Sequence, residues 1–490
     1  MQPADGKSAS WLGMRLVFSV AAFLIYAAIP TRNHYWDGVA FALAIEDARA
    51  FGAGGIGTLL HPNHLFYNLT GFAVYRMLGA SIRALYLLQF MNAAFASITV
   101  YVLFGLMERA TRSPRAALLL SAFFAFSGTW WRFSTDADAY ILSVCLMAVC
   151  ASLLVSGKKP WMVAAVHAAA MVTHQLAVFL APAAIVLVWR NRRRWRDVVA
   201  YVACAAALTL AAYVGAFRLT SAGGDLGLWA WLTSHSTDSD FTFNTAGNAF
   251  VTLRSWGQLF IAGRPSRVHY TEPFVMLLLA LLGVSAILFV VAVLRMRSVP
   301  SIRIHHPDLF MFSAIWIASY ALFLFFWLPH NTFYKLFALP AVVLLAASLW
   351  PPGRDPGKPA AWFVCTVALF NLSFAVIPYS RPDANAAIQF ALDLRTHLGD
   401  GAHVHYASFS ADDWFARYFN PQSTWQQTLE TQPIDEDLRA GHDVWLETTA
   451  IDRFTASNPE WIAERTRGAQ WVELLTGQQR IRFVRLRAPV

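Results

Sequence analysis

Two acidic stretches, about a hundred residues apart, hold the side chains best suited to chemistry in this chain. Asp37 follows the first hydrophobic segment and stands between Trp36 and Gly38. Asp136 and Asp138 stand at the edge of another hydrophobic segment. A carboxylate loses solvation energy at a membrane. Two acidic sites on the same side of the membrane therefore predict that both serve one function. A carboxylate placed there can take the proton from an attacking hydroxyl or amine.

The same aspartates also fit a structural role, because Asp is a preferred helix N-cap. A helix from Gly38 to Arg49 would use Asp37 as its cap, and a helix beginning after the second stretch would use Asp138 or Asp136. Three features favour chemistry: both stretches fall on one face of the predicted topology, Arg132 adds a cation beside the second, and that stretch holds two carboxylates. Both interpretations stay open for Asp37.

Polar and cationic side chains recur at helix ends on the same side. The motif His61-Pro62-Asn63-His64 begins a short apolar run, where a lipid headgroup would lie. His174-Gln175 interrupts a long apolar segment, and half-length helices that meet at a polar residue indicate a cavity. A histidine among alanines is also commonly a packed core residue, and Lys335 can extend to the interface. The predicted substrate-binding residues are His61, Asn63, His64, Arg132, Tyr140, His174, Gln175, His330, Tyr334 and Lys335.

The composition predicts a membrane protein. Of 490 residues, 57% are hydrophobic and 14% are charged, and the mean hydropathy is +0.45, whereas soluble proteins have about a quarter charged residues. The net charge of +9 lies largely in clusters beside apolar runs, so it does not indicate a nucleic-acid partner. The four cysteines lie in apolar runs and indicate neither a disulfide nor a metal site. The first apolar segment lacks a cleavage site, which predicts an uncleaved anchor with a cytoplasmic N-terminus.

Basic clusters determine the predicted topology. Residues 109–115, 158–159, 191–196 and 295–303 are expected in the cytoplasm. A crossing at 64–78 would put the first cluster outside, so this run is predicted to be a re-entrant or interfacial helix. About eleven crossings remain, at 11–29, 84–107, 116–133, 139–156, 161–174, 176–190, 197–219, 272–295, 307–328, 333–350 and 360–378.

The chain divides into two predicted parts. Residues 1–379 form a membrane module, in which the tryptophan-rich outer loop 220–271 is expected to hold interfacial helices. Residues 380–490 have a soluble composition and form a small α/β domain, placed outside the cytoplasm by the number of crossings. Its predicted strands lie at 403–408, 443–448 and 481–487.

Sugar transfer from a lipid carrier suits these groups. A polyprenyl-phosphate sugar has an apolar tail for the bilayer, an anionic phosphate for cations and an anomeric carbon open to attack. The sequence resembles the GT-C superfamily of membrane glycosyltransferases, which has an acidic residue in the first external loop, a His/Lys-Pro helix start and a second acidic site. The matching residues here are Asp37, Leu60-His61-Pro62 and Asp136 with Asp138.

Over residues 11–350 the chain is most similar to the bacterial branch related to protein O-mannosyltransferases. The likeness rests on Trp36-Asp37-Gly38, Asp138-Ala139-Tyr140 and Thr173-His174-Gln175. Two departures stand out: an aspartate replaces the usual glutamate of the second motif, and Asn63-His64 replaces Pro-Gly at the helix start.

The resemblance implies a polytopic GT-C-like fold and an inverting hexosyltransferase in the inner (plasma) membrane. Asp37 would be the general base, Asp138 with Asp136 would support the acceptor or a metal, and His174 with Lys335 would hold the donor phosphate. Some members of the superfamily use a divalent metal and others do not. No set of four ligands is evident here, so no tightly bound metal is expected, and a divalent metal stays an open alternative. The expected partners are a polyprenyl-phosphate sugar and membrane lipids. The acceptor, whether protein, lipid or glycan, stays open.

Two other functions compete with transfer. A transporter or flippase for a lipid-linked or anionic substrate would also carry ionisable residues in the membrane, commonly with internal repeats. This sequence has no evident repeat, and its ionisable residues gather at the outer helix ends, which favours surface chemistry. A scaffold for the C-terminal domain is the third alternative, and the presence of Asp37 and Asp138 speaks against it.

Overall fold

The computed structural model describes residues 5–50, 52–79, 81–220, 227–234, 241–296, 303–408, 411–476 and 479–487. The chain forms two compact units. A helical unit comprises Met1–Thr31 and Ala44–Ser380, and an α/β unit comprises Arg32–Leu43 and Arg381–Val490. Asp37 therefore belongs to the unit formed mainly by the C-terminal residues.

Long apolar runs form the helical unit, because an α-helix satisfies every backbone polar group inside a bilayer. In the described part of the chain, six helices are long and apolar enough to cross a membrane. They are α1 (Asp5–Ala28), α4 (Ala84–Thr111), α10 (Trp195–Leu219), α13 (Pro273–Leu294), α14 (Pro307–Phe326) and the run of α16 (Lys358–Asn371), a π-helical turn (Leu372–Val376) and α17 (Ile377–Tyr379). The prediction of a polytopic helical membrane protein is confirmed.

Shorter helices occupy the remaining predicted crossings. They are α5 (Pro114–Ala125), α7 (Tyr140–Val155), α8 (Pro160–Thr173), α9 (Ala181–Arg192) and α15 (Leu339–Leu349). Three predicted crossings are broken rather than continuous, because a second short helix precedes or follows the main one. These additional helices are α6 (Gly128–Ser134) after α5, the 3-10 helix η2 (Gln175–Leu180) before α9, and the 3-10 helix η6 (Phe333–Ala338) before α15.

Further short helices form in the run 64–78 and in the two outer loops of the predicted topology. The helix α3 (Leu65–Met77) has 13 residues, or about 20 Å at 1.5 Å per residue, against about 30 Å of hydrocarbon. Length alone does not separate α3 from α5, α8, α9 and α15, which have 11–14 residues and occupy predicted crossings, so the re-entrant or interfacial helix stays a prediction. The others are α2 (Trp36–Ala50), the 3-10 helix η1 (Gly52–Leu59), α11 (Leu228–Thr233) and α12 (Thr245–Phe260).

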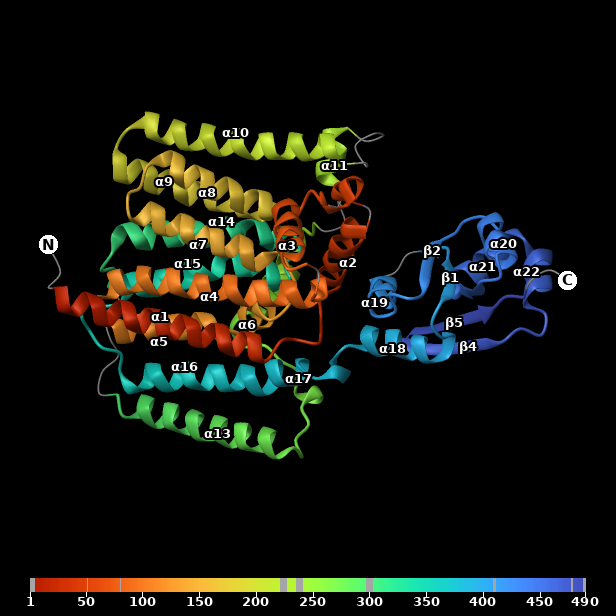
Figure 1. Cartoon of the computed structure of the whole chain (residues 1–490). Helices are drawn as coiled ribbons and strands as arrows, with labels where there is room; N and C mark the ends of the chain where they lie inside the picture. The colour runs from red at the N-terminus through yellow and green to blue at the C-terminus, as the bar shows by residue number, and fades with distance from the viewer. Residues whose placement is uncertain are drawn as a thin grey trace. The chain divides into compact units, whose positions relative to one another are not determined.

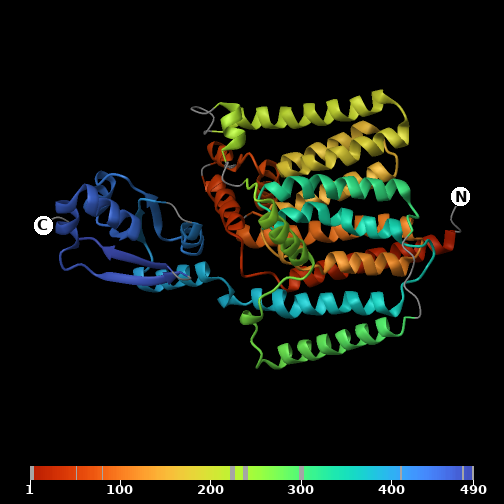
Figure 2. The same cartoon turned by 180° about the vertical axis from the view of Figure 1, so that it is seen from behind.

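The basic connections of the helical unit gather at one end. Arg190 forms an ion pair with Asp308 at 2.6 Å, and the Asn191 amide donates to the Leu154 carbonyl at 2.8 Å. Figure 1 shows these connections at the end where α1 begins, and the starts of α4 and α7 at the other end, beside α3. Both views place α10 at one edge of this unit, and α13 at the opposite edge packs on α16 (Figures 1 and 2).

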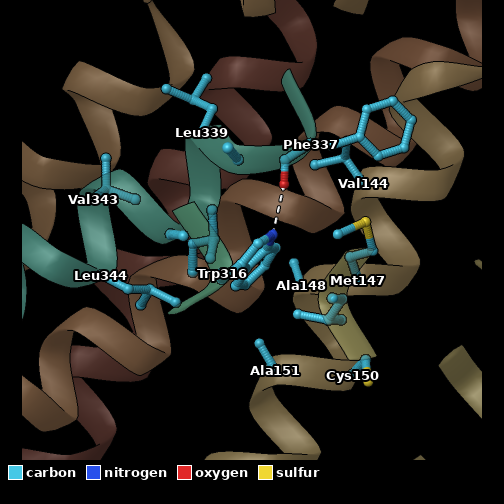
Figure 3. Packing of buried hydrophobic residues seen from close by; sticks show 14 of the residues in the cluster. Val144, Met147, Ala148, Cys150, Ala151, Trp316, Phe337, Leu339, Val343 and Leu344 are labelled. Carbon is cyan, nitrogen blue, oxygen red and sulfur yellow. Dashed lines mark hydrogen bonds between the residues drawn. The ribbon is translucent and has the colours of Figure 1, made fainter. Parts of the chain in front are cut away.

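The centre of the helical unit is an apolar core between α7, α14 and α15. Trp316 of α14 is fully buried, and its Nε1 donates to the Phe337 carbonyl at 2.9 Å, which satisfies the polar group of an otherwise apolar ring. Figure 3 shows this bond and the side chains around it. The surrounding residues are Val144, Met147, Ala148, Cys150, Ala151, Leu339, Val343 and Leu344.

The α/β unit is built on one five-stranded sheet with the order β2-β1-β3-β5-β4. β1 is parallel to β2 and β3, while β5 is antiparallel to β3 and β4. The predicted strands correspond to β1 (Ala402–Tyr406), β3 (Asp443–Glu447) and β5 (Gln479–Arg485). The sequence missed the two edge strands β2 (Thr424–Gln427) and β4 (Trp471–Thr476), and β2 is too polar and exposed to show alternation. The helices are α18 (Ala386–Leu398), α19 (Ala411–Phe419), α20 (Gln432–Arg439), α21 (Thr448–Ser457) and α22 (Pro459–Thr466).

Candidate active site

The linker between α6 and α7 carries the second acidic stretch, and two amides of α4 hold it. The Asn92 amide donates to the carbonyls of Asp136 and Asp138, both at 2.7 Å. One turn earlier, Gln89 donates to the carbonyls of Thr31 and Thr135 at 2.9 and 2.8 Å. These bonds satisfy backbone groups that would otherwise be buried without partners. The linker is therefore fixed to a neighbouring helix.

Both carboxylates of the linker are buried and bond to the backbone directly after them. Asp136 Oδ1 accepts from the N–H of Ala137 at 2.9 Å, and Asp138 Oδ1 accepts from that of Ala139 at 2.7 Å. The N-cap position of α7 belongs to Ala139, with no side-chain capping bond. Neither aspartate therefore caps α7, and the capping interpretation fails for this stretch.

Tyr67 of α3 is a residue of this site that the sequence did not single out. Burial, together with the charges of Asp138 and Asp136, raises the pKa of the Tyr67 hydroxyl well above its ordinary value. Its signal was present: Tyr67, Gly71 and Tyr75 follow one another at helical spacing, and all are buried. This stripe turns one face of α3 toward the protein.

An aromatic and imidazole cluster surrounds Tyr140, the first residue of α7. Its ring lies 5.1 Å from His174 and 5.8 Å from Tyr334, between ring centres. His64 lies 5.0 Å from His174, and His61 stacks on His64 at 5.3 Å. Five predicted substrate-binding residues, from four separate segments, thus meet in one place: His61, His64, Tyr140, His174 and Tyr334.

His174 marks the predicted helix break and terminates α8. Its backbone is extended, with φ −156° and ψ 125°, and its Nδ1 accepts from the Leu176 N–H at 3.2 Å as the N-cap of η2. Because Nδ1 accepts, the proton of the neutral ring lies on Nε2. The neighbouring Gln175 amide donates to the Pro62 carbonyl at 3.3 Å, which joins η2 to the loop before α3.

Lys335 is fully buried and does not extend to the interface. Its Nζ donates to the carbonyls of Pro329 and Asn331 at 3.0 and 2.8 Å, so two of the three ammonium hydrogens bind its own turn. His330 of the same turn is exposed. Lys335 therefore has a structural role in addition to any contact with a substrate.

The remaining predicted residues of the helical unit lie around this cluster. The Arg132 guanidinium lies over the Tyr379 ring at 5.1 Å. Asn63 is partly exposed, and its backbone N–H donates to His61 Nδ1 at 3.2 Å, which closes the turn before α3.

Asp37 belongs to the α/β unit and is not among the residues that the helical unit brings together. It lies in the first turn of α2 rather than at the flanking cap position. The preceding Trp36 stacks on Trp414 with ring centres 5.3 Å apart. Burial raises the pKa of the Asp37 carboxyl to about 7, so this group changes charge near neutral pH.

An apolar cavity of about 490 Å³ lies along the same 3-10 helix that His174 begins. Phe179 of η2 forms part of its wall and stacks on Phe323 of α14 at 4.4 Å. Tyr320 fixes η2 to α14, since its hydroxyl donates to the Leu176 carbonyl at 2.6 Å. The other lining residues are Pro182, Phe241, Phe243, Ser319, Leu322 and Phe326. One short helix thus joins a polar cluster to an apolar cavity.

No protein-family model matches this chain, and no curated protein matches it in sequence. Solved structures do match. ArnT from Cupriavidus metallidurans bound to undecaprenyl phosphate superposes with a TM-score of 0.60 at 13% identity, over 98% of this chain and 99% of ArnT. Its apo structure gives a TM-score of 0.61 at 11% identity, over 99% and 100%. The chain therefore has the fold of ArnT, which confirms the GT-C-like fold class.

Proposed function

We propose that this chain is a glycosyltransferase that moves a hexose from a polyprenyl-phosphate or related lipid-linked donor to an acceptor hydroxyl or amine. The observation that carries the proposal is the likeness, over nearly the full length, to ArnT bound to undecaprenyl phosphate. The chain's own residues support it. The buried carboxylates of Asp136 and Asp138 directly precede the cluster around Tyr140 and His174.

Transfer proceeds by direct displacement. The acceptor oxygen or nitrogen attacks the anomeric carbon, the bond from that carbon to the phosphate oxygen breaks, and the lipid phosphate leaves with inversion. Asp37 takes the acceptor proton, because a general base works best with a pKa near the operating pH, and burial raises the Asp37 pKa to about 7. Asp138 and Asp136 orient the acceptor.

The donor has two parts that the helical unit accommodates separately. The Nε2–H of His174 and the third hydrogen of the Lys335 ammonium are suited to the phosphate, since charge-assisted bonds stabilise a leaving anion. The apolar tail extends into the cavity lined by Phe179 and Phe323. His174 caps η2 through the Leu176 N–H, and Phe179 of η2 lines the cavity. The position of η2 therefore sets the distance between the proposed phosphate site and the proposed tail site.

The reaction takes place at the outer face of the inner membrane. The basic connections at the far end of the helical unit belong in the cytoplasm by the charge bias of membrane proteins. The candidate site lies at the opposite end of the same helices (Figure 1).

Transfer of labelled sugar by the purified, detergent-solubilised protein tests the proposal. A panel of polyprenyl-phosphate sugars is offered, and both labelled product and released polyprenyl phosphate are measured. Asp138→Asn should lower the rate by about a hundredfold, because the acceptor is no longer held in position for attack. Asp308→Asn is the matched control, because Asp308 pairs with Arg190 at the opposite end. Movement of intact labelled lipid across vesicles without any transfer would instead identify a flippase and overturn the proposal.

A further inference from the structure

Three side chains of the α/β unit converge at a place outside the candidate active site. His403 of β1, Asp437 of α20 and His442 each offer one ligand atom, and these atoms all lie within 4.8 Å of one another. In the described part of the chain, this is the one group of at least three His, Cys, Asp or Glu residues placed so closely. The proposed transfer reaction uses none of them.

The backbone at the end of α20 brings two of these residues together. Gly441 adopts a φ of 83°, which glycine tolerates because it lacks a Cβ. Its N–H donates to the Leu438 carbonyl at 3.1 Å, and the His442 N–H donates to the Asp437 carbonyl at 3.1 Å. This is a Schellman motif. It fixes His442 beside Asp437 independently of their side chains.

A buried imidazole orients the carboxylate. His403 and His405 lie on the same face of β1, since side chains alternate along a strand. Asp437 Oδ2 lies 3.2 Å from His403 Nδ1 and 3.0 Å from His405 Nε2. The His405 side chain is 1% exposed, and its Nδ1 lies 2.7 Å from Thr428 Oγ1. Metal-binding carboxylates are commonly held by such hydrogen-bonded partners.

We propose that His403, Asp437 and His442 bind a divalent transition-metal ion, with Zn²⁺ the best fit. Two imidazoles and a carboxylate suit Zn²⁺, whereas Ca²⁺ and Mg²⁺ prefer oxygen ligands throughout. Bonds of about 2.0–2.2 Å in a tetrahedral site put neighbouring ligand atoms about 3.4 Å apart. The separation of His403 Nδ1 and Asp437 Oδ2 is 3.2 Å. The His442 ring stacks on His403 with ring centres 3.9 Å apart, and because its side chain is exposed, binding requires only that this ring turn toward the ion.

The ion ties the end of α20 to β1, and a water molecule completes its coordination. Because Zn²⁺ binds the folded state, it should stabilise this part of the unit by an amount that grows with the logarithm of the free Zn²⁺ concentration above its Kd.

Metal content and hydrogen exchange test the site in the full-length protein, purified in detergent with any histidine tag removed. The wild type should retain about one equivalent more Zn²⁺ than His442→Ala or His403→Ala, each of which should bind at least about tenfold more weakly. Zn²⁺ should also slow amide exchange across residues 431–447 in the wild type only. His442 is exposed, so its replacement leaves the fold intact.

His397→Ala is the matched control, because His397 is an exposed histidine of the same unit that bonds its own helix at the Asp393 carbonyl. This variant should bind Zn²⁺ like the wild type. Equal Zn²⁺ content in the wild type, His442→Ala and His403→Ala would assign the metal to other histidines and overturn the proposal. Unchanged exchange at 431–447 on adding Zn²⁺ to the wild type would do the same.

Discussion

Asp37→Asn separates the two roles that the sequence left open for this residue. Asparagine keeps the shape of the side chain and serves nearly as well at a helix N-terminus, but it does not accept a proton from the acceptor. Loss of a general base costs about a hundred- to ten-thousandfold in rate. We expect this loss in the transfer of labelled sugar by the purified variant. A stable variant with near-normal transfer would leave Asp37 with a structural role only.

The pH profile of transfer provides an independent check on the same group. A base must be deprotonated to act, so the rate should rise with pH up to about 7, the raised pKa of Asp37, and then level off. The raised pKa also has a consequence for stability. The unfolded carboxyl ionises near pH 4, so the folded state loses stability as the pH rises from there to about 7. Asp37→Asn should therefore unfold at a higher temperature than the wild type at pH 8. The expectation would be contradicted if the unfolding temperatures of the two proteins differed by the same amount at pH 4 and at pH 8.

Among the helices, the sequence predicted the broken crossings least well. The run 116–133 has the length and polarity of one crossing, yet α5 ends at Ala125. A contact from far along the chain supports this break, which falls at Ser127-Gly128: the Asn371 amide donates to the carbonyls of Phe126 and Phe260, both at 2.8 Å. Asn371 thereby satisfies a carbonyl that a continuous helix would have used internally. A contact between residues so far apart in the chain cannot be predicted from local hydropathy.

Asn92 and Gln89 of α4 are also residues whose structural role the sequence did not predict. Their positions in a long apolar run make them look like incidental polar residues of a crossing, but they hold the linker that carries Asp136 and Asp138. His174 was predictable because it breaks the apolar run itself. A polar residue that interrupts a pattern is visible in sequence, whereas one that supports a distant loop is visible only after folding.

Substitutions of His174 can separate its role as the cap of η2 from its proposed role in binding the donor phosphate. His174→Asn keeps a capping acceptor for the Leu176 N–H but removes the Nε2–H proposed for the phosphate. A lost charge-assisted bond of about 1.5–3 kcal/mol corresponds to about a ten- to hundredfold weaker use of the donor. The variant should therefore show a raised KM for the lipid donor and a normal unfolding temperature.

His174→Ala is the companion variant, because it removes the cap as well as the phosphate contact. It should unfold at a lower temperature than His174→Asn and use the donor equally poorly. If both variants retain the wild-type KM, the donor phosphate does not bind at His174.

Composition and charge predicted the membrane fold of this chain, because crossing a bilayer imposes long apolar runs and an excess of basic residues in the cytoplasmic connections. The sequence did not predict that Arg32–Leu43 packs with the C-terminal residues. Residues 32–43 lie in a predicted outer loop. Nothing in their local sequence pattern distinguishes a loop that packs on the helices from a loop that packs with another unit. The unit to which Asp37 belongs is therefore determined by tertiary contacts that its local sequence pattern does not show.

The run from Lys358 to Tyr379 begins beside the basic connections and ends at the face of the candidate site (Figure 1), so it should carry the chain out of the cytoplasm. A reporter enzyme that folds only outside should be active when fused after Asn385. The same reporter fused after Arg193, within the basic connection between α9 and α10, should be inactive. The reverse pattern would place the α/β unit in the cytoplasm, and an acceptor and a donor headgroup would then have to meet at the inner face.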